Sequence, residues 1–66
     1  MRCTVNDDPR DLPEGASVAD LLTALNLPST RCAVEVNRNL VRRADHATHR
    51  LAEGDQIEVV TLVGGG

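Results

Sequence analysis

The last three residues of the sequence, 64–66, are all glycine and carry its most distinctive chemistry. Because glycine has no Cβ, such a backbone can pass through a channel that would exclude any other residue. A carboxylate on Gly66 would then reach an external active site without steric cover. Hydroxide is a poor leaving group, so this carboxylate needs activation, for which a mixed anhydride with AMP is suitable. The tail therefore predicts a group that another enzyme modifies, and the simpler interpretation is a mobile chain end.

The other nucleophilic and metal-binding residue types do not form a recognisable catalytic set. Ser17 precedes an apolar stripe and Ser29 follows a proline, and neither has a histidine or an acid at a known motif spacing. His46 and His49 are three residues apart in a polar segment, whereas a structural zinc site needs four ligands. We therefore expect no metal site and interpret both histidines as solvated loop residues.

The two cysteines, Cys3 and Cys32, alternate with apolar residues in strand-like segments, which predicts buried thiols. They form no CxxC pair, and a small disulfide-stabilised domain usually has four or more cysteines. We expect both thiols to stay reduced.

Four of the seven arginines fall within residues 38–50, where only Asp45 offsets them: Arg38, Arg42, Arg43 and Arg50. The simpler interpretation of this cluster is a solvated face, because exposed charges are the ordinary case. The alternative is an electrostatic docking patch for an acidic partner surface. The sequence leaves both interpretations open.

Length and composition limit the class of protein. Sixty-six residues make at most one domain with a small core, which leaves no room for a deep active-site cleft and disfavours a self-sufficient enzyme. The net charge of −3 and the absence of aromatic residues argue against nucleic-acid binding, which needs cations and stacking platforms. The longest apolar stretch, 57–63, is far shorter than the roughly 20 residues that span a bilayer, and no signal peptide is recognisable. We expect a cytoplasmic protein.

The clearest predicted element is an amphipathic helix of about eleven residues. Ser17 and Asp20 have the spacing of a capping box at its start, and Pro28 closes it. One apolar stripe follows the helical period along Val18, Leu21, Leu22 and Leu25.

Alternating apolar residues predict strands before and after this helix, at 1–5, near Leu12, and at 32–37, 40–41 and 56–62. Tight turns are expected at 37–39 and 53–55, because asparagine and glycine tolerate positive φ. Residues 44–50 are polar and irregular, and Leu51 is expected to fill a gap in the core. The element order predicts an α+β fold in which one helix covers one face of a mixed sheet.

Three blocks of this sequence resemble those of ThiS-type sulfur carriers. They are AVEVNRNLV at 33–41, SVADLL at 17–22, and GDQIEVV at 54–60 followed by VGGG at 63–66. The resemblance covers essentially the whole chain. It implies a β-grasp, ubiquitin-like fold of about five strands with the last strand in mid-sheet, a domain at 1–62 and a flexible glycine-rich tail at 63–66.

The resemblance also implies a carrier rather than an enzyme. A ThiF-type adenylating enzyme would use ATP to convert Gly66 to an acyl-adenylate, and no cofactor would be bound by the carrier itself. Sulfur from a cysteine desulfurase or another donor system would then give a thiocarboxylate. The thiazole synthase ThiG would take this sulfur in thiamine biosynthesis. The residues that enter the partners' active sites would be Val63, Gly64, Gly65 and Gly66.

A partner surface is expected beside this tail on a carrier that is a monomer when free. Val60 and Leu62 lie on the opposite parity of the last strand from Ile57 and Val59. They are candidates for an exposed apolar patch that partners contact, and the alternative is that they cover a second edge of the core. The candidate surface also includes Arg38, Arg42 and Arg43.

Two details follow from the resemblance. Relatives commonly have proline where Arg42 stands, which bears on the choice of partner more than on the tail chemistry. In the β-grasp strand order Cys3 and Cys32 are two strands apart, about 9–10 Å. This separation exceeds the roughly 7 Å limit for a disulfide.

Two alternatives remain open at this stage. A related carrier for molybdopterin or cysteine synthesis would share the tail chemistry but usually has a longer chain and a different block before the two glycines. A ubiquitin-like tag or binding module would tolerate the loss of Gly66, and the absence of lysine forbids ordinary lysine-linked chains of this protein.

Overall fold

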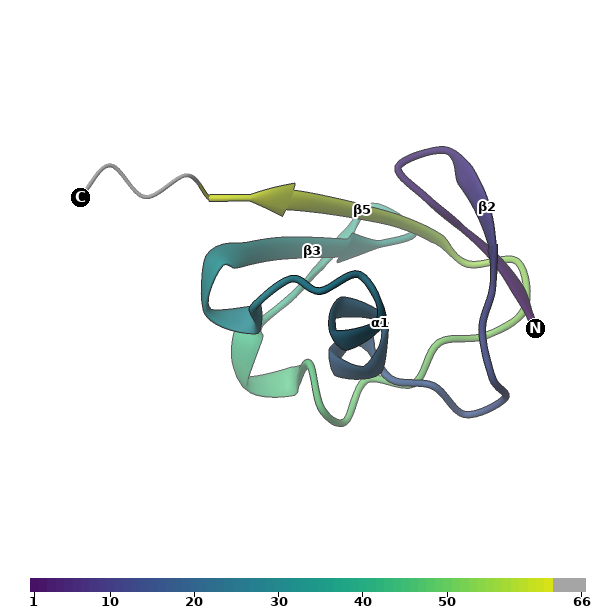
Figure 1. Ribbon diagram of the computed structural model, residues 1–66, viewed down its shortest axis with the longest axis horizontal. Helices are drawn as coiled ribbons and strands as arrows, with labels where there is room; N and C mark the ends of the chain where they lie inside the picture. The colour runs from purple at the N-terminus through teal and green to yellow at the C-terminus, as the bar shows by residue number, and fades with distance from the viewer. Residues whose placement is uncertain (63–66) are drawn as a thin grey trace.

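A computed structural model describes residues 1–62 of the protein, in which one α-helix lies across one face of a five-stranded mixed sheet (Figure 1). The strands are β1 (Arg2–Val5), β2 (Asp8–Asp11), β3 (Cys32–Val36), β4 (Asn39–Val41) and β5 (Gln56–Thr61). The helix is α1 (Val18–Ala24), and two 3₁₀ turns are η1 (Ser29–Arg31) and η2 (Arg43–Asp45). The predicted α+β class and element order are confirmed.

The sheet has the strand order β2-β1-β5-β3-β4, so the last strand lies in its centre, as the resemblance implied. Strand β5 is parallel to β1 and antiparallel to β3. Two-residue turns join the outer hairpins, and both central residues of each turn have positive φ: Asn6 and Asp7 after β1, Asn37 and Arg38 after β3. This backbone matches the right-handed twist of the strands that it connects, and it confirms the turn predicted at 37–39.

The start of α1 is a capping box, as predicted. The Oγ of Ser17 accepts a hydrogen bond from the Asp20 backbone N–H at 3.1 Å, and the Asp20 carboxylate accepts one from the Ser17 N–H at 2.9 Å. The predicted length of about eleven residues is wrong, because the helix ends at Ala24. Asn26 adopts a φ of 58°, and the Leu27 N–H bonds to the Leu22 carbonyl at 2.9 Å. This Schellman closure ends the helix before Pro28 is reached.

The core lies between α1 and the sheet. Its most deeply buried side chains come from the helix stripe and from β1, β3 and β5: Val18, Leu21, Leu22, Cys3, Val34 and Ile57. Leu51 is buried beside them, as predicted, and both cysteines are free and buried. No helix within residues 1–62 is long and apolar enough to cross a membrane.

The interpretation of His46 as a solvated loop residue is wrong, since its side chain is only 3% exposed. Its Nε2 lies 3.1 Å from the Val41 carbonyl oxygen. The backbone of the same segment covers the start of the helix, because the His46 carbonyl accepts from the Ala19 N–H at 2.8 Å and the His49 carbonyl from the Val18 N–H at 3.0 Å. These carbonyls bind N–H groups that have no partner within a helix, so residues 46–49 are held against α1 and the histidine is buried.

Candidate functional site

The candidate site begins where β5 ends. Strand β5 runs through the middle of the sheet and points to the end of the molecule opposite the N-terminus (Figure 1). The predicted tail residues Val63, Gly64, Gly65 and Gly66 lie outside the described residues. The last described residue, Leu62, is still held next to the start of β3, because its N–H donates to the carbonyl of Arg31, the residue before that strand, at 2.6 Å.

The side chain of Asn6 holds the middle of β5. Strand β1 pairs with β5 only at Thr4 and Val5 and then turns away into its hairpin. Beyond that point the Asn6 Oδ1 accepts a hydrogen bond from the Val59 N–H at 2.8 Å, and its Nδ2 donates to the Val59 carbonyl at 3.1 Å. One side-chain amide thus takes the place of a strand residue beside β5.

A second asparagine fixes the start of β5. The Asn37 Oδ1 accepts from the Gln56 N–H at 3.0 Å, and the Asn37 N–H donates to the Gln56 carbonyl at 2.7 Å. Its Nδ2 donates to the Asp55 carboxylate at 3.0 Å. The sequence indicated Asn37 only as part of a turn at 37–39, with no contact to the last strand. Because both Asn6 and Asn37 bind β5, the strand that leads to the tail is anchored along its length, as precise positioning of a functional group requires.

Three large hydrophobic side chains are exposed at this end of the sheet: Leu40 at 66%, Val60 at 58% and Leu62 at 54%. We call these three residues the outer patch. Val60 lies on the helix-free face, since its neighbours Ile57 and Val59 are buried on the other face. The exposure expected for Val60 and Leu62 is confirmed, and the alternative that they cover a core edge is wrong. The exposure of Leu40 was not predicted. Adjacent residues of a strand face opposite sides of the sheet, so one of the neighbours Leu40 and Val41 had to face away from the core.

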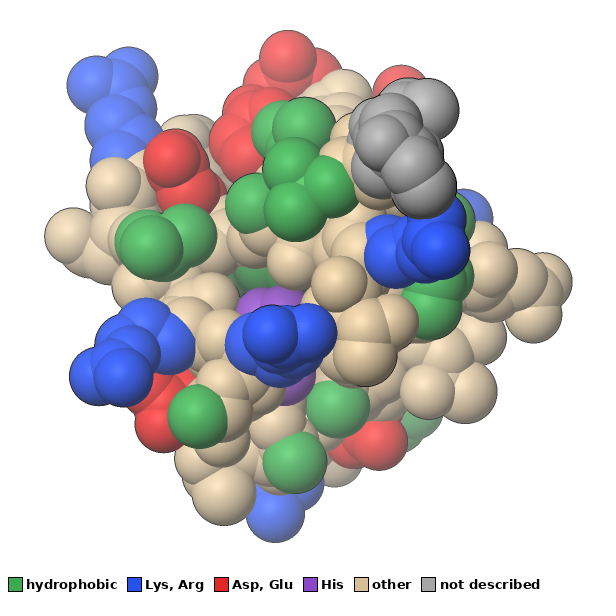
Figure 2. Space-filling model, turned by 90° about the vertical axis from the view of Figure 1, so that its left-hand side faces the viewer, with side chains coloured by type: hydrophobic (Ala, Val, Ile, Leu, Met, Phe, Trp, Pro, Cys, Tyr) green, Lys and Arg blue, Asp and Glu red, His purple; other side chains and the backbone are tan. Residues whose placement is uncertain are grey.

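A hollow of about 240 Å³ lies beside the outer patch, between η1 and the end of β4. Its lining includes Ser29, Cys32, Leu40, Arg42, Arg43 and Leu62. Figure 2 shows this end of the molecule, where hydrophobic and basic side chains lie next to one another. Small-molecule sites usually enclose about 300–1,000 Å³. The hollow is therefore better suited to one or two side chains of a partner protein than to a cofactor.

The predicted arginine cluster is divided by the fold. Arg42 and Arg43 are exposed and line the hollow. The expected position of Arg38 beside the tail is wrong, because Arg38 is exposed in the turn between β3 and β4, next to the start of β5 and not to its end. Arg50 lies elsewhere, where its guanidinium donates to the Gly15 carbonyl at 2.9 Å. Within residues 1–62 none of these four arginines forms an ion pair.

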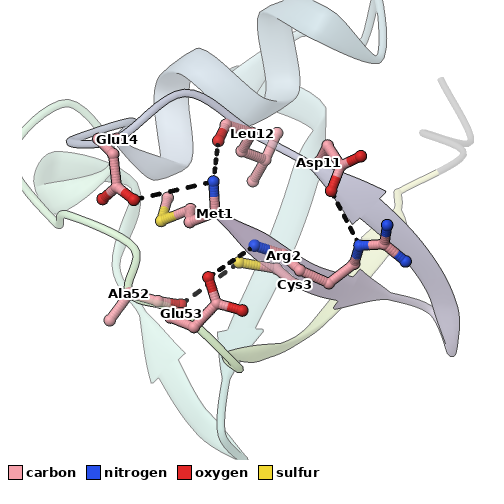
Figure 3. Close-up of polar contacts among 8 residues, drawn as sticks. All are labelled: Met1, Arg2, Cys3, Asp11, Leu12, Glu14, Ala52 and Glu53. Carbon is pink, nitrogen blue, oxygen red and sulfur yellow. Dashed lines mark hydrogen bonds and ion pairs between the residues drawn. The ribbon is translucent and has the colours of Figure 1, made fainter.

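The polar contacts around the N-terminus form a separate, structural group (Figure 3). The Met1 amino group donates to the Leu12 carbonyl at 2.8 Å, and the Arg2 guanidinium pairs with Asp11 at 2.8 Å. The Cys3 thiol lies 3.4 Å from the Ala52 carbonyl. Burial, together with the nearby charge of Asp55, raises the pKa of the Cys3 thiol. A protonated, buried thiol is a poor nucleophile, so Cys3 behaves as a core residue.

Potential metal ligands are scattered over the described part of the chain. Within residues 1–62 no three His, Cys, Asp or Glu side chains are grouped so that they could hold a metal ion. The features that remain at the candidate site are an anchored central strand, the outer patch and the hollow.

Comparison with known proteins relates the whole chain to one family. The ThiS family model matches residues 2–66. The chain is 30% identical over 66 residues to the sulfur carrier protein ThiS of Escherichia coli, and the match covers the full length of both sequences. It is 36% identical to a thiazole synthase of Magnetococcus marinus, but spans only 20% of the length of that protein. The crystal structure of a ThiS thiamine biosynthesis protein from Geobacter metallireducens superposes with a TM-score of 0.84 at 30% identity and full coverage of both chains.

Proposed function

Because the chain belongs to the ThiS family of sulfur carriers of thiamine biosynthesis, we propose that it carries sulfur on the carboxylate of Gly66. A ThiF-type partner would transfer AMP from ATP to this carboxylate and release pyrophosphate. The outer sulfur of a persulfide, supplied by a cysteine desulfurase or another donor, would then displace AMP. A thiol would cleave the resulting S–S bond, leaving the thiocarboxylate.

The observation that carries this proposal is the match to the E. coli sulfur carrier protein ThiS, which extends over all 66 residues compared. The fold supports it, because the central strand β5 leads to the tail and both Asn6 and Asn37 anchor that strand. A strand that is held in place on both sides fixes the point from which the chain continues toward Gly66, and precise positioning of this kind is what presentation of a substrate group to another protein's active site requires. ATP would be bound by the adenylating partner, not by this chain.

Thiazole synthase is the proposed acceptor of the sulfur. A segment similar to this whole chain makes up a fifth of a thiazole synthase from M. marinus. Two functions that are joined in one polypeptide are expected to meet in space. This finding favours thiazole formation over molybdopterin or cysteine synthesis as the process that consumes the thiocarboxylate.

The proposed contact surface for both enzymes lies beside the tail. The outer patch presents Val60 and Leu62 on the same end of the sheet from which the tail continues. The hollow beside it would receive an apolar partner side chain, and Arg42 and Arg43 at its rim would bind partner carboxylates. Arg38 lies in the turn beside the start of β5, at the opposite end of that strand from Leu62, and is not part of the proposed surface.

The proposal is tested by thiazole formation in a reconstituted mixture of the protein, a ThiF-type enzyme, ATP, a persulfide source and ThiG. The wild type is expected to support product formation, and a variant that lacks Gly66 is expected to support none. Because the variant without Gly66 still ends in a glycine carboxylate, that of Gly65, the matched comparison is a variant that lacks residues 64–66 and has no terminal glycine carboxylate. This variant is also expected to support no product formation. Product formation by the variant without Gly66 alone would overturn the assignment of the sulfur to Gly66, and product formation by the variant without residues 64–66 would overturn the carrier proposal as a whole.

A further inference from the structure

Two glutamates face each other in the middle of the sheet. Glu35 of β3 is the direct partner of Glu58 of β5, and both side chains are exposed on the face without the helix. Directly opposed residues of antiparallel strands have Cβ atoms about 4.5–5.5 Å apart, and like charges in that position destabilise the sheet. Within residues 1–62 neither carboxylate forms an ion pair, and no side-chain or backbone donor is hydrogen-bonded to either.

This carboxylate pair borders the outer patch. Leu40 of β4 is paired with Glu35 on its other side, and Val60 lies two residues beyond Glu58 on the same face of β5. Figure 2 shows acidic and hydrophobic side chains side by side near this edge of the molecule. The two negative charges and the exposed apolar side chains therefore form one continuous surface across the three strands β4, β3 and β5.

Within residues 1–62 no ion pair offsets the repulsion between these two carboxylates. Charged residues on edge strands prevent edge-to-edge aggregation, but β3 and β5 both have neighbours on each side. Arg42 directly follows β4 in the sequence, but it makes no ion pair with Glu35 in the described part of the chain. A cation from outside the molecule would remove the repulsion.

We propose that this face is a docking surface for a protein that presents an arginine or lysine side chain between Glu35 and Glu58 and apolar side chains against the outer patch. The inference rests on the proposed function and identifies the occupant as the enzyme that adenylates the tail. A guanidinium has the planar geometry to bridge two carboxylates. Covering the outer patch would exclude water and so strengthen this attraction.

The test uses Glu58→Gln and Glu35→Gln variants, which remove one charge each with little change in shape. Asp8→Asn is the matched control, because Asp8 is exposed on the edge strand β2 and forms no ion pair within residues 1–62. The melting temperature would be measured by far-ultraviolet circular dichroism. The Kd for a ThiF-type enzyme would be measured by calorimetry without ATP, at low and at high salt.

The two measurements should change in opposite directions for each glutamate variant. Removal of the repulsion is expected to raise the melting temperature by about 3 °C. Loss of the carboxylate is expected to weaken binding about tenfold at low salt. The difference should shrink at high salt, where exposed charges are screened, and Asp8→Asn should leave the Kd unchanged.

Unchanged affinity of both glutamate variants, with normal adenylation of the wild type, would overturn this inference and leave the proposed function standing. The two carboxylates would then serve only to keep an apolar surface soluble. If the wild type is neither bound nor adenylated by the enzyme, the proposed function fails, and the inference fails with it.

Discussion

Replacement of Asn6 by alanine is expected to lower the free energy of unfolding by about 3 kcal/mol, since one side chain holds the middle of the central strand. The change removes both hydrogen bonds to Val59, each worth about 1 kcal/mol net. Val59 is only 8% exposed, so its backbone groups gain little from water in exchange. Alanine at the φ of 50° that Asn6 adopts adds roughly 1 kcal/mol of backbone strain.

This loss is large for so small a domain. At about 0.05–0.15 kcal/mol per residue, 66 residues give roughly 3–10 kcal/mol of total stability. The alanine variant is therefore expected to be partly unfolded at 37 °C. Glycine at position 6 would remove the same hydrogen bonds without the strain, because glycine adopts positive φ readily. It should be more stable than the alanine variant by about 1 kcal/mol.

The assay is urea unfolding followed by far-ultraviolet circular dichroism, because the protein contains no Trp or Tyr for fluorescence. Asp7→Ala is the matched control. Asp7 has a φ of 70° in the same turn, and its exposed side chain makes no hydrogen bond within residues 1–62. This variant should show the strain alone. If Asn6→Ala is no more destabilising than Asp7→Ala, the amide of Asn6 does not hold β5 and the reasoning is refuted.

Four further predictions follow from the core, the helix cap, the buried thiol and the tail. Leu21→Ala removes a fully buried side chain and should cost about 2–5 kcal/mol, measured by urea unfolding. Hydrogen bonds from Ser17 hold the pKa of Asp20 below its ordinary value of 3.8, so wild type should exceed Asp20→Asn in stability above that pH and lose this advantage as the pH falls through the lower, folded-state pKa. The buried Cys3, with its raised thiol pKa, should react with a disulfide reagent at neutral pH only after urea is added; fast reaction of the native protein would contradict this. Deletion of Gly66 should abolish thiazole formation and leave the melting temperature nearly unchanged, and a large loss of stability would contradict the assignment of the domain to residues 1–62.

Local patterns in the sequence predict those parts of the fold that depend on nearby residues. The Ser17–Asp20 spacing predicts the start of α1, because a capping box involves only four consecutive residues. The turn at Asn37 is predicted for the same reason. The end of the helix is not predicted correctly, because both Asn26 and Pro28 could end it. Asn26 comes first in the chain, and its left-handed backbone conformation ends the helix before Pro28.

Long-range contacts explain what the patterns could not show. His46 is buried because the backbone of its loop binds the start of α1, a contact across more than twenty residues of sequence. Asn6 binds Val59 across 53 residues. The position of the last strand in mid-sheet was likewise available only from the resemblance to a family, since strand pairing is non-local.

The candidate site shows the same division. Strand parity predicts the exposure of Val60 and Leu62, because side chains alternate between the faces of a sheet. The hollow beside Arg42 and the opposition of Glu35 to Glu58 depend on the pairing of β3 with its neighbours. Neither could be derived before the register of these strands was known.

The central claim is that Gly66 carries the sulfur, and the intact mass of the protein tests it most directly. The protein would be incubated with a ThiF-type enzyme, ATP and a persulfide source, with omission of ATP as the control. We predict an ATP-dependent gain equal to the exchange of one oxygen for one sulfur, localised by fragmentation to Gly66. An unchanged mass in the presence of an enzyme that is active on its own carrier would contradict the account.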